Sequence, residues 1–207
     1  MTWRSVASVF VALALAGCLS QTGGGHGDWY AARVAPPPSG DRVYVCHGYG
    51  CRVVSRVTLS PAEIAQIAGP LAQGAEDAEA ERAAISGAVQ RYETIVGART
   101  GTSGDRGRMD FGRGDASQMD CIDEATNTTS LLVFLEERGH LRHHKVGRPV
   151  ARGILIDGRY PHATAVLAET GKDGASGGSW AVDSWPEPNG GPPLIQPLQT
   201  WMRSSGG

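Results

Sequence analysis

The sequence predicts an α+β protein in which helices pack on a small antiparallel sheet. Apolar residues recur at helical spacings between about residues 60 and 139, whereas the segments after residue 150 have the alternation and turn residues of strands. Helices followed by strands are typical of the α+β class. The chain has 207 residues and is 41% hydrophobic, which suffices for one sizeable core, so we expect one globular domain.

The first residues have the composition of a targeting segment. Arg4 is the only charge before the apolar run Val6 to Ala16, and Gly17 and Cys18 follow directly. The run is too short to span a bilayer, and small residues precede the cysteine, as a signal-peptidase site requires. This arrangement resembles the lipobox of bacterial lipoproteins. The resemblance implies a signal peptide at residues 1–17 and a lipid on Cys18; a secretory signal cut nearby and a retained anchor are the alternatives.

Each of these possibilities places the mature protein outside the cytoplasm. Leu19 rather than Asp follows the cysteine, and the sorting habit of Gram-negative lipoproteins then implies a lipid anchor in the outer membrane, facing the periplasm. Residues 18–40 are rich in Gly and Pro and are predicted to form a flexible tether. The folded domain is expected at residues 41–207.

Export affects how the cysteines are interpreted. Cys46 and Cys51 lie in VYVCHGYGCRVV, where Gly48 and Gly50 permit a tight turn between strand-like flanks. They are the natural disulfide pair, and closing so short a loop contributes about 2 kcal/mol on the chain-entropy estimate. If Cys18 carries lipid, Cys121 is left without an intramolecular partner.

Neither a cofactor nor a metal is predicted. A c-type haem site needs CxxCH, which the spacing of the two cysteines does not give. A metal site that uses His47 lacks enough nearby ligands. The net charge of −2 and the pI near 6.3 show no basic excess, so no nucleic-acid partner is expected. Nothing in the sequence indicates an oligomeric state.

Two helices are predicted before residue 101. Ser60 to Glu63 form a capping box with Pro at the first helical position, and this short helix is expected to be interrupted at Gly69-Pro70. The second helix begins at about Ala75. Its apolar residues recur at spacings of three and four and form one buried stripe, which comprises Ile85, Val89, Tyr92 and Val96.

A third helix is predicted to begin at Cys121, with Asp120 as its N-cap, and to end at Gly139. Its expected inward face comprises Ile122, Ala125, Thr129, Leu132 and Val133. At the first turn, the helix dipole and the backbone N–H groups favour a thiolate on Cys121. Asp120, Asp123 and Glu124 oppose it, so a positive partner is needed. Alternatively, Cys121 is a small buried apolar residue.

The remainder of the chain is predicted to form strands. Asp157-Gly158 suits a type I′ turn between two strand-like arms. The second arm continues over residues 162–167, and another strand is expected at residues 179–185. If the loop between these strands is centred between Lys172 and Asp173, His162 lies opposite Asp183, within reach of a hydrogen bond.

A cysteine at a helix start in an acidic context, a histidine that opens HATAVL and an aspartate in WAVDSW occur in this order. Over residues 85–201 the chain resembles the bacterial transglutaminase-like cysteine proteinases of the papain-like superfamily. The resemblance implies a papain-like or transglutaminase-like core. It also implies a catalytic triad of Cys121, His162 and Asp183.

The residues of this triad would divide the chemistry among them. His162 would accept the thiol proton, and Asp183 would orient the imidazole. The Cys121 thiolate would attack an amide carbonyl of a protein or peptide substrate, and water or an amine would then complete hydrolysis or acyl transfer. The Cys121 N–H is one expected oxyanion donor, and the Gln118 side chain is a candidate second donor unless it is an ordinary loop residue.

The sequence leaves two functional classes open. The first is an exported lipoprotein with thiol-dependent amidase, peptidase or acyltransferase activity. The second is a non-catalytic binding lipoprotein that keeps the same fold, which a large separation between Cys121 and His162 would favour.

Overall fold

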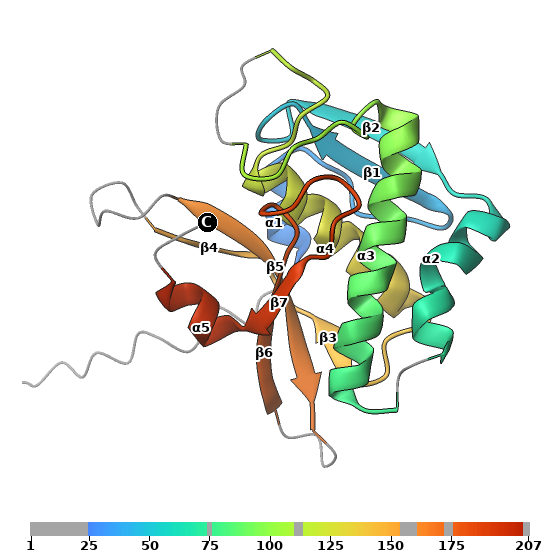
Figure 1. Ribbon diagram of the computed structural model, residues 1–207, viewed down its shortest axis with the longest axis vertical. Helices are drawn as coiled ribbons and strands as arrows, with labels where there is room; N and C mark the ends of the chain where they lie inside the picture. Colours follow the sequence, from blue (N-terminus) through green and yellow to red (C-terminus); the bar gives the residue numbers. More distant parts are fainter. Residues whose placement is uncertain (1–24, 74–75, 110–113, 154–160, 172–175, 205–207) are drawn as a thin grey trace, which may run out of the picture.

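The computed structural model describes residues 25–73, 76–109, 114–153, 161–171 and 176–204. Within these ranges the chain forms five helices, a two-stranded antiparallel sheet and a five-stranded antiparallel sheet (Figure 1). The predicted α+β class is therefore confirmed. The predicted lipidation site at Cys18 and the predicted Asp157-Gly158 turn lie outside the described residues.

The elements follow one another along the chain in the order α1 (Gly27–Ala31), β1 (Arg42–His47), β2 (Val53–Thr58), α2 (Pro61–Gln73), α3 (Ala78–Thr100), α4 (Cys121–Glu137), β3 (His144–Val146), β4 (Val150–Arg152), β5 (His162–Thr170), β6 (Ser176–Asp183), β7 (Leu194–Pro197) and α5 (Leu198–Arg203). None of the helices that the structure describes combines the length and the apolar character that crossing a bilayer requires.

The β1–β2 hairpin carries the predicted disulfide between Cys46 and Cys51. Gly48 and Gly50 have φ angles of +78° and +70°, in the left-handed region that the loop needs and that glycine adopts without a steric penalty. The structure therefore confirms both the disulfide pairing and the turn that the sequence predicts here.

Helix α2 begins as the sequence predicts but does not end at Gly69-Pro70. Ser60 and Glu63 form the expected reciprocal hydrogen bonds at its start. Pro70, however, lies inside the helix. A proline inside a helix removes one hydrogen bond, but the Pro70 ring packs so closely on α3 that a Cβ at Gly87 would lie 3.2 Å from it. The predicted interruption is wrong because this packing with α3 offsets the local cost.

Helix α4 is the centre of the molecule (Figure 1). It contacts β1, α3 and the five-stranded sheet, and its residues 123–135 are all buried. The prediction of one inward face is therefore too narrow. Polar residues are tolerated here because they are hydrogen-bonded; Asn127, for example, bonds both backbone groups of Cys46, at 2.7 and 2.8 Å.

The five-stranded sheet is built around β5. Strand β3 pairs with the C-terminal half of β5, and β4 pairs with its N-terminal half, where Arg152 lies opposite His162. Gly147 lies between β3 and β4 and approaches β5 so closely that a Cβ there would lie 2.9 Å from the Val166 side chain. Strands β6 and β7 continue the sheet on the other side of β5.

The register of β5 and β6 differs by two residues from the predicted one. Ala165 lies opposite Val182, whereas the predicted loop centre would place it opposite Trp180. The pairing is irregular between Ala168 and Thr170, where sequence alone gives no signal of a bulge. Because side chains alternate with a period of two, the shift of two leaves the paired side chains of residues 165–168 and 179–182 on their expected faces, whereas Thr170, opposite Ser176, is one residue from the predicted pairing.

Part of the segment predicted to be a flexible tether is folded. Within residues 18–40, helix α1 buries Trp29 and Tyr30, which are 5% and 2% exposed. The Trp29 indole N–H donates to Thr126 Oγ1 at 2.9 Å, and the Tyr30 hydroxyl bonds Ser130 Oγ at 3.1 Å. The packed region therefore begins before residue 41.

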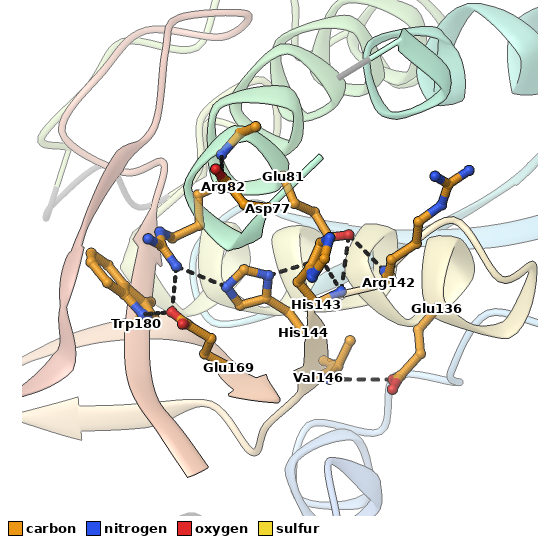
Figure 2. A network of polar contacts seen from close by, with 11 residues as sticks. Asp77, Glu81, Arg82, Glu136, Arg142, His143, His144, Val146, Glu169 and Trp180 are labelled. Atoms are coloured by element: carbon orange, nitrogen blue, oxygen red, sulfur yellow. Dashed lines mark hydrogen bonds and ion pairs between the residues drawn. The ribbon is translucent and has the colours of Figure 1, made fainter. Parts of the chain in front are cut away.

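A buried polar network joins α3 to β3 and to the sheet (Figure 2). His144 Nδ1 lies 2.8 Å from Glu81 Oε1, and His144 Nε2 lies 3.1 Å from Arg82 Nη1. A guanidinium can only donate, so His144 Nε2 accepts and Nδ1 carries the proton. Arg82 also bonds Glu169 at 2.6 Å, and the Trp180 indole N–H donates to the same carboxylate.

Glu81 completes this network. Its carboxylate accepts the backbone N–H groups of Arg142 at 2.6 Å and of His143 at 3.0 Å, as well as the His144 ring N–H (Figure 2). Burial acts to raise the pKa of Glu81, but these hydrogen bonds together outweigh burial and lower the pKa below its ordinary value. Glu81 is therefore an ionised carboxylate inside the protein, held by three donors.

Replacing Glu81 by glutamine should destabilise the fold. An amide presents N–H groups to the donors that the carboxylate now satisfies, and leaving buried donors unpaired costs about 1–3 kcal/mol. We expect Glu81→Gln to lower the midpoint of thermal unfolding measured by circular dichroism. Glu79→Gln, at an exposed position two residues away on the same helix, is the control. Equal melting temperatures for both variants would contradict a stabilising role for this network.

Candidate active site

The predicted triad residues come from three element ends that the fold brings close together. Cys121 is the first residue of α4, His162 the first of β5 and Asp183 the last of β6. His162 Nε2 lies 2.6 Å from Asp183 Oδ2, and both side chains are buried. The Cys121 thiol is directed to the carbonyl oxygen of Pro161, at 3.9 Å from Sγ. Cys121 therefore lies against the residue that precedes His162.

Trp185 also connects the cysteine with the histidine. It belongs to the same apolar cluster as Cys121, together with Trp29, Ala125 and Ala163. Its ring centroid lies 4.6 Å from that of His162. The imidazole therefore packs on a buried indole that belongs to the same apolar cluster as Cys121.

The protonation of His162 follows from its partner. An ionised carboxylate only accepts, so the 2.6 Å contact with Asp183 requires that Nε2 of His162 carries a proton. In the neutral imidazole the lone pair is then on Nδ1. This nitrogen is buried and has no hydrogen-bond partner among the described residues. It is the atom available to accept a proton from a thiol.

The N-terminal turn of α4 is capped by two carboxylates. Asp120 Oδ1 accepts the N–H groups of Ile122 and Asp123, at 3.0 and 2.9 Å, and the Asp123 carboxylate accepts the Asp120 N–H at 3.2 Å. Asp123 also accepts the N–H groups of Tyr49 at 2.8 Å and of Cys51 at 2.6 Å. The disulfide loop is therefore fastened to the helix turn that begins with Cys121.

The Gln118 side chain is turned toward the neighbouring loop. Its amide N–H groups donate to the carbonyls of Gly104 at 2.9 Å and Ser117 at 3.4 Å, and its oxygen accepts the N–H of Arg106 at 3.2 Å. Its role as a second oxyanion donor stays a prediction, and one of these hydrogen bonds would have to break for it.

Arg33 is a site residue that the sequence analysis missed. Its guanidinium lies 3.2 Å from the centroid of the Trp29 ring, and Nη1 donates to the Trp29 carbonyl at 3.1 Å. Burial lowers the pKa of Arg33, whereas the charges of Asp120 and Cys121 act to raise it. Arg33 therefore supplies positive charge beside Cys121. The sequence does contain a signal for this part of the site. Trp29 and Tyr30 are an aromatic pair shortly before Arg33, in a segment otherwise rich in glycine and proline.

Four acidic side chains near the candidate site are buried; they are Glu93, Asp105, Asp123 and Glu124. Ser184, which follows Asp183, donates to Glu124 at 2.6 Å. Burial raises the pKa of Glu93 to about 8 and the pKa values of Asp105 and Asp123 to about 7. The same cause raises the pKa of Glu124 well above its ordinary value. Glu124 thus keeps its proton to higher pH than an exposed glutamate, which reduces the opposition to a Cys121 thiolate expected from sequence.

These acids predict that stability falls as pH rises. A raised pKa means that the folded state binds the proton more tightly, so the stabilisation is complete below the ordinary carboxyl pKa and is lost as pH rises to about 7–8. We expect the melting temperature to decrease from about pH 5 to pH 8, and Glu93→Gln to flatten this dependence. Glu79→Gln should leave it unchanged. A melting temperature that rises over this range would contradict the assignment.

A cavity of about 450 Å³ opens on the far side of the triad. Asp183 and Trp201 form part of its wall, and the residues lining it are Arg108, Arg152, Asp183, Pro186, Glu187, Leu194, Gln196, Trp201 and Ser204. Neither Cys121 nor His162 is among these lining residues. The cavity therefore reaches the carboxylate end of the triad.

One group of potential metal ligands occurs within the described ranges. Cys46, Cys51 and Asp123 offer ligand atoms that lie within 4.8 Å of one another. The two sulfurs form the disulfide, so they are not the thiolates that a metal would bind. This group does not fit a metal while the disulfide is intact.

Comparison with known proteins assigns no family to this arrangement. No protein-family model matches the chain, and neither a curated protein nor a solved structure matches it. The functional assignment therefore depends on the geometry of Cys121, His162 and Asp183, and the papain-like resemblance remains a proposal.

Proposed function

We propose that this protein is an exported thiol enzyme of papain-like or transglutaminase-like type that cleaves or transfers amide bonds of proteins or peptides. The observation that carries the proposal is the buried His162–Asp183 pair, whose 2.6 Å hydrogen bond leaves Nδ1 of His162 to act as a base. Cys121 is the first residue of α4, and its Sγ lies 3.9 Å from the carbonyl oxygen of Pro161, the residue before His162, so it is the nucleophile that we propose.

The reaction would divide into two transfers. Nδ1 of His162 accepts the Cys121 proton, and the thiolate attacks the carbonyl carbon to form a C–S bond. The tetrahedral intermediate collapses, the C–N bond breaks, and the amine leaves with the proton from His162. Water, or a second amine, then attacks the acyl-thioester and releases the thiol. Asp183 stabilises the imidazolium while it exists.

Specific observations favour the second candidate, a non-catalytic binding lipoprotein of the same fold. Cys121 is only 7% exposed and His162 only 2% exposed. The Gln118 amide is engaged by the loop at residues 104–106 rather than directed to Cys121. If the region around Cys121 never opens to a substrate, the protein would bind its partners at another part of its surface.

Thiol reactivity distinguishes the two candidates. If His162 deprotonates Cys121, iodoacetamide should alkylate Cys121 substantially below pH 7, and His162→Ala should lower the rate at pH 6 by about 100-fold, as expected for a thiol returned to its ordinary pKa of about 8.5. His140→Ala, at a half-buried histidine outside the site, is the matched control. A wild-type rate that rises only above about pH 8.5, and that His162→Ala does not change, would favour the binding protein.

We also propose that the protein is lipid-anchored through Cys18 in the outer membrane, facing the periplasm. The Cys46–Cys51 disulfide is consistent with an oxidising compartment. Mass spectrometry of the native protein should find a diacylglyceryl group on Cys18, and Cys18→Ser should lose this group and the association with membranes. An unmodified N-terminus at another residue would exclude the anchor.

A further inference from the structure

Asp183 has a second hydrogen-bond donor besides His162. The indole Nε1–H of Trp201 donates to Asp183 Oδ2 at 2.8 Å, the same oxygen that accepts the His162 Nε2–H at 2.6 Å. Trp201 lies on the C-terminal helix α5 and is fully buried, and its ring centroid is 5.3 Å from that of His162. An indole N–H can only donate, so Asp183 Oδ2 is the acceptor of this bond.

We propose that Trp201 is a positioning residue of the triad, which holds the Asp183 carboxylate so that His162 stays in the Nε2–H tautomer. The inference rests on the proposed function, because it assigns a role within the same triad. Through Trp201, the C-terminal helix becomes a part of the catalytic apparatus.

A residue of the sheet, Arg152 on β4, holds Trp201 in place. The Arg152 guanidinium lies 4.5 Å from the centroid of the Trp201 ring and donates to the carbonyl of Ser204, just after α5. In the β4–β5 pairing, Arg152 lies opposite His162. Side-chain contacts therefore connect Arg152 to Trp201, Trp201 to Asp183 and Asp183 to His162, and the backbone pairing of β4 with β5 holds the two ends of this series on neighbouring strands.

The tautomer matters because only one form of His162 can act on Cys121. When Nε2 carries the proton, Nδ1 has the lone pair that accepts the thiol proton. If the Asp183 carboxylate turns away, the Nδ1–H form becomes populated, and this form cannot act as the base at Nδ1. A carboxylate fixed by two donors is held in place more firmly than one fixed by His162 alone.

The structure offers a matched control in Trp185. Its ring also packs on the imidazole, at 4.6 Å, but its indole N–H donates to the Met109 carbonyl at 3.3 Å instead of to Asp183. Phenylalanine retains a stacking ring and removes only the N–H. Trp201→Phe and Trp185→Phe together therefore separate the hydrogen bond to Asp183 from the packing on His162.

The test measures the His162 tautomer directly, by ¹⁵N NMR of the histidine-labelled mature chain, at a pH at which the two ring ¹⁵N shifts of His162 themselves show a neutral imidazole. We expect the Nε2–H form in wild type and in Trp185→Phe, and a clear gain of the Nδ1–H form in Trp201→Phe. Alkylation of Cys121 by iodoacetamide at pH 7 should slow by about tenfold or more in Trp201→Phe. Trp180→Phe, which removes an indole N–H that donates to Glu169 outside the site, should leave the rate unchanged. A folded Trp201→Phe variant that keeps the Nε2–H form overturns the inference.

Two further outcomes remain decisive. If Trp201→Phe does not fold, the indole N–H resonance of Trp201 in the otherwise unchanged chain should shift in Asp183→Asn, and the absence of a shift overturns the inference. If wild-type Cys121 proves unreactive below pH 8.5, the proposed function fails. The tautomer comparison still reports whether Trp201 positions Asp183.

Discussion

The N-terminal turn of α4 is buried, so the protein itself must satisfy the backbone N–H groups that every helix start exposes. Asp120 and Asp123 do this with their carboxylates, and Asp123 extends the same bonding to the loop at residues 49–51. Two parts of the chain that are distant in sequence are thereby joined at one residue. The direction of the Cys121 side chain follows from this capping, because the residue after an N-cap has little conformational freedom.

The sheet provides the other half of the candidate site. His162 opens β5 and Asp183 closes β6, so both side chains belong to a rigid scaffold, and Trp185 and Trp201 enclose the imidazole. A hydrogen bond between buried groups is stronger than in water, but it leaves little tolerance for a missing partner. The arrangement therefore combines a candidate nucleophile on a helix with a candidate base on a sheet.

The sequence predicts the parts of this structure that depend on local chemistry. The capping box at Ser60 to Glu63, the N-cap at Asp120 and the disulfide between Cys46 and Cys51 depend on spacing within short segments. So does the placing of Cys121, His162 and Asp183, in this order, on a helix and two strands. The parts it does not predict depend on contacts between distant segments. Pro70 stays helical because of α3, the β5–β6 register depends on a bulge, and Trp29 is buried because α4 offers Thr126 as an acceptor. Gln118 bonds a loop whose path the sequence does not reveal.

The packing of α1 beside Cys121 sets a limit on where the protein could work. Gly25 follows Cys18 by seven positions, and so short a stretch of chain reaches at most about 25 Å when fully extended. Trp29 lies four residues after Gly25 and belongs to the apolar cluster that contains Cys121. A lipid on Cys18 would therefore hold the Cys121 thiol close to the bilayer surface. Substrates close to the membrane surface would then be the ones that the site can reach.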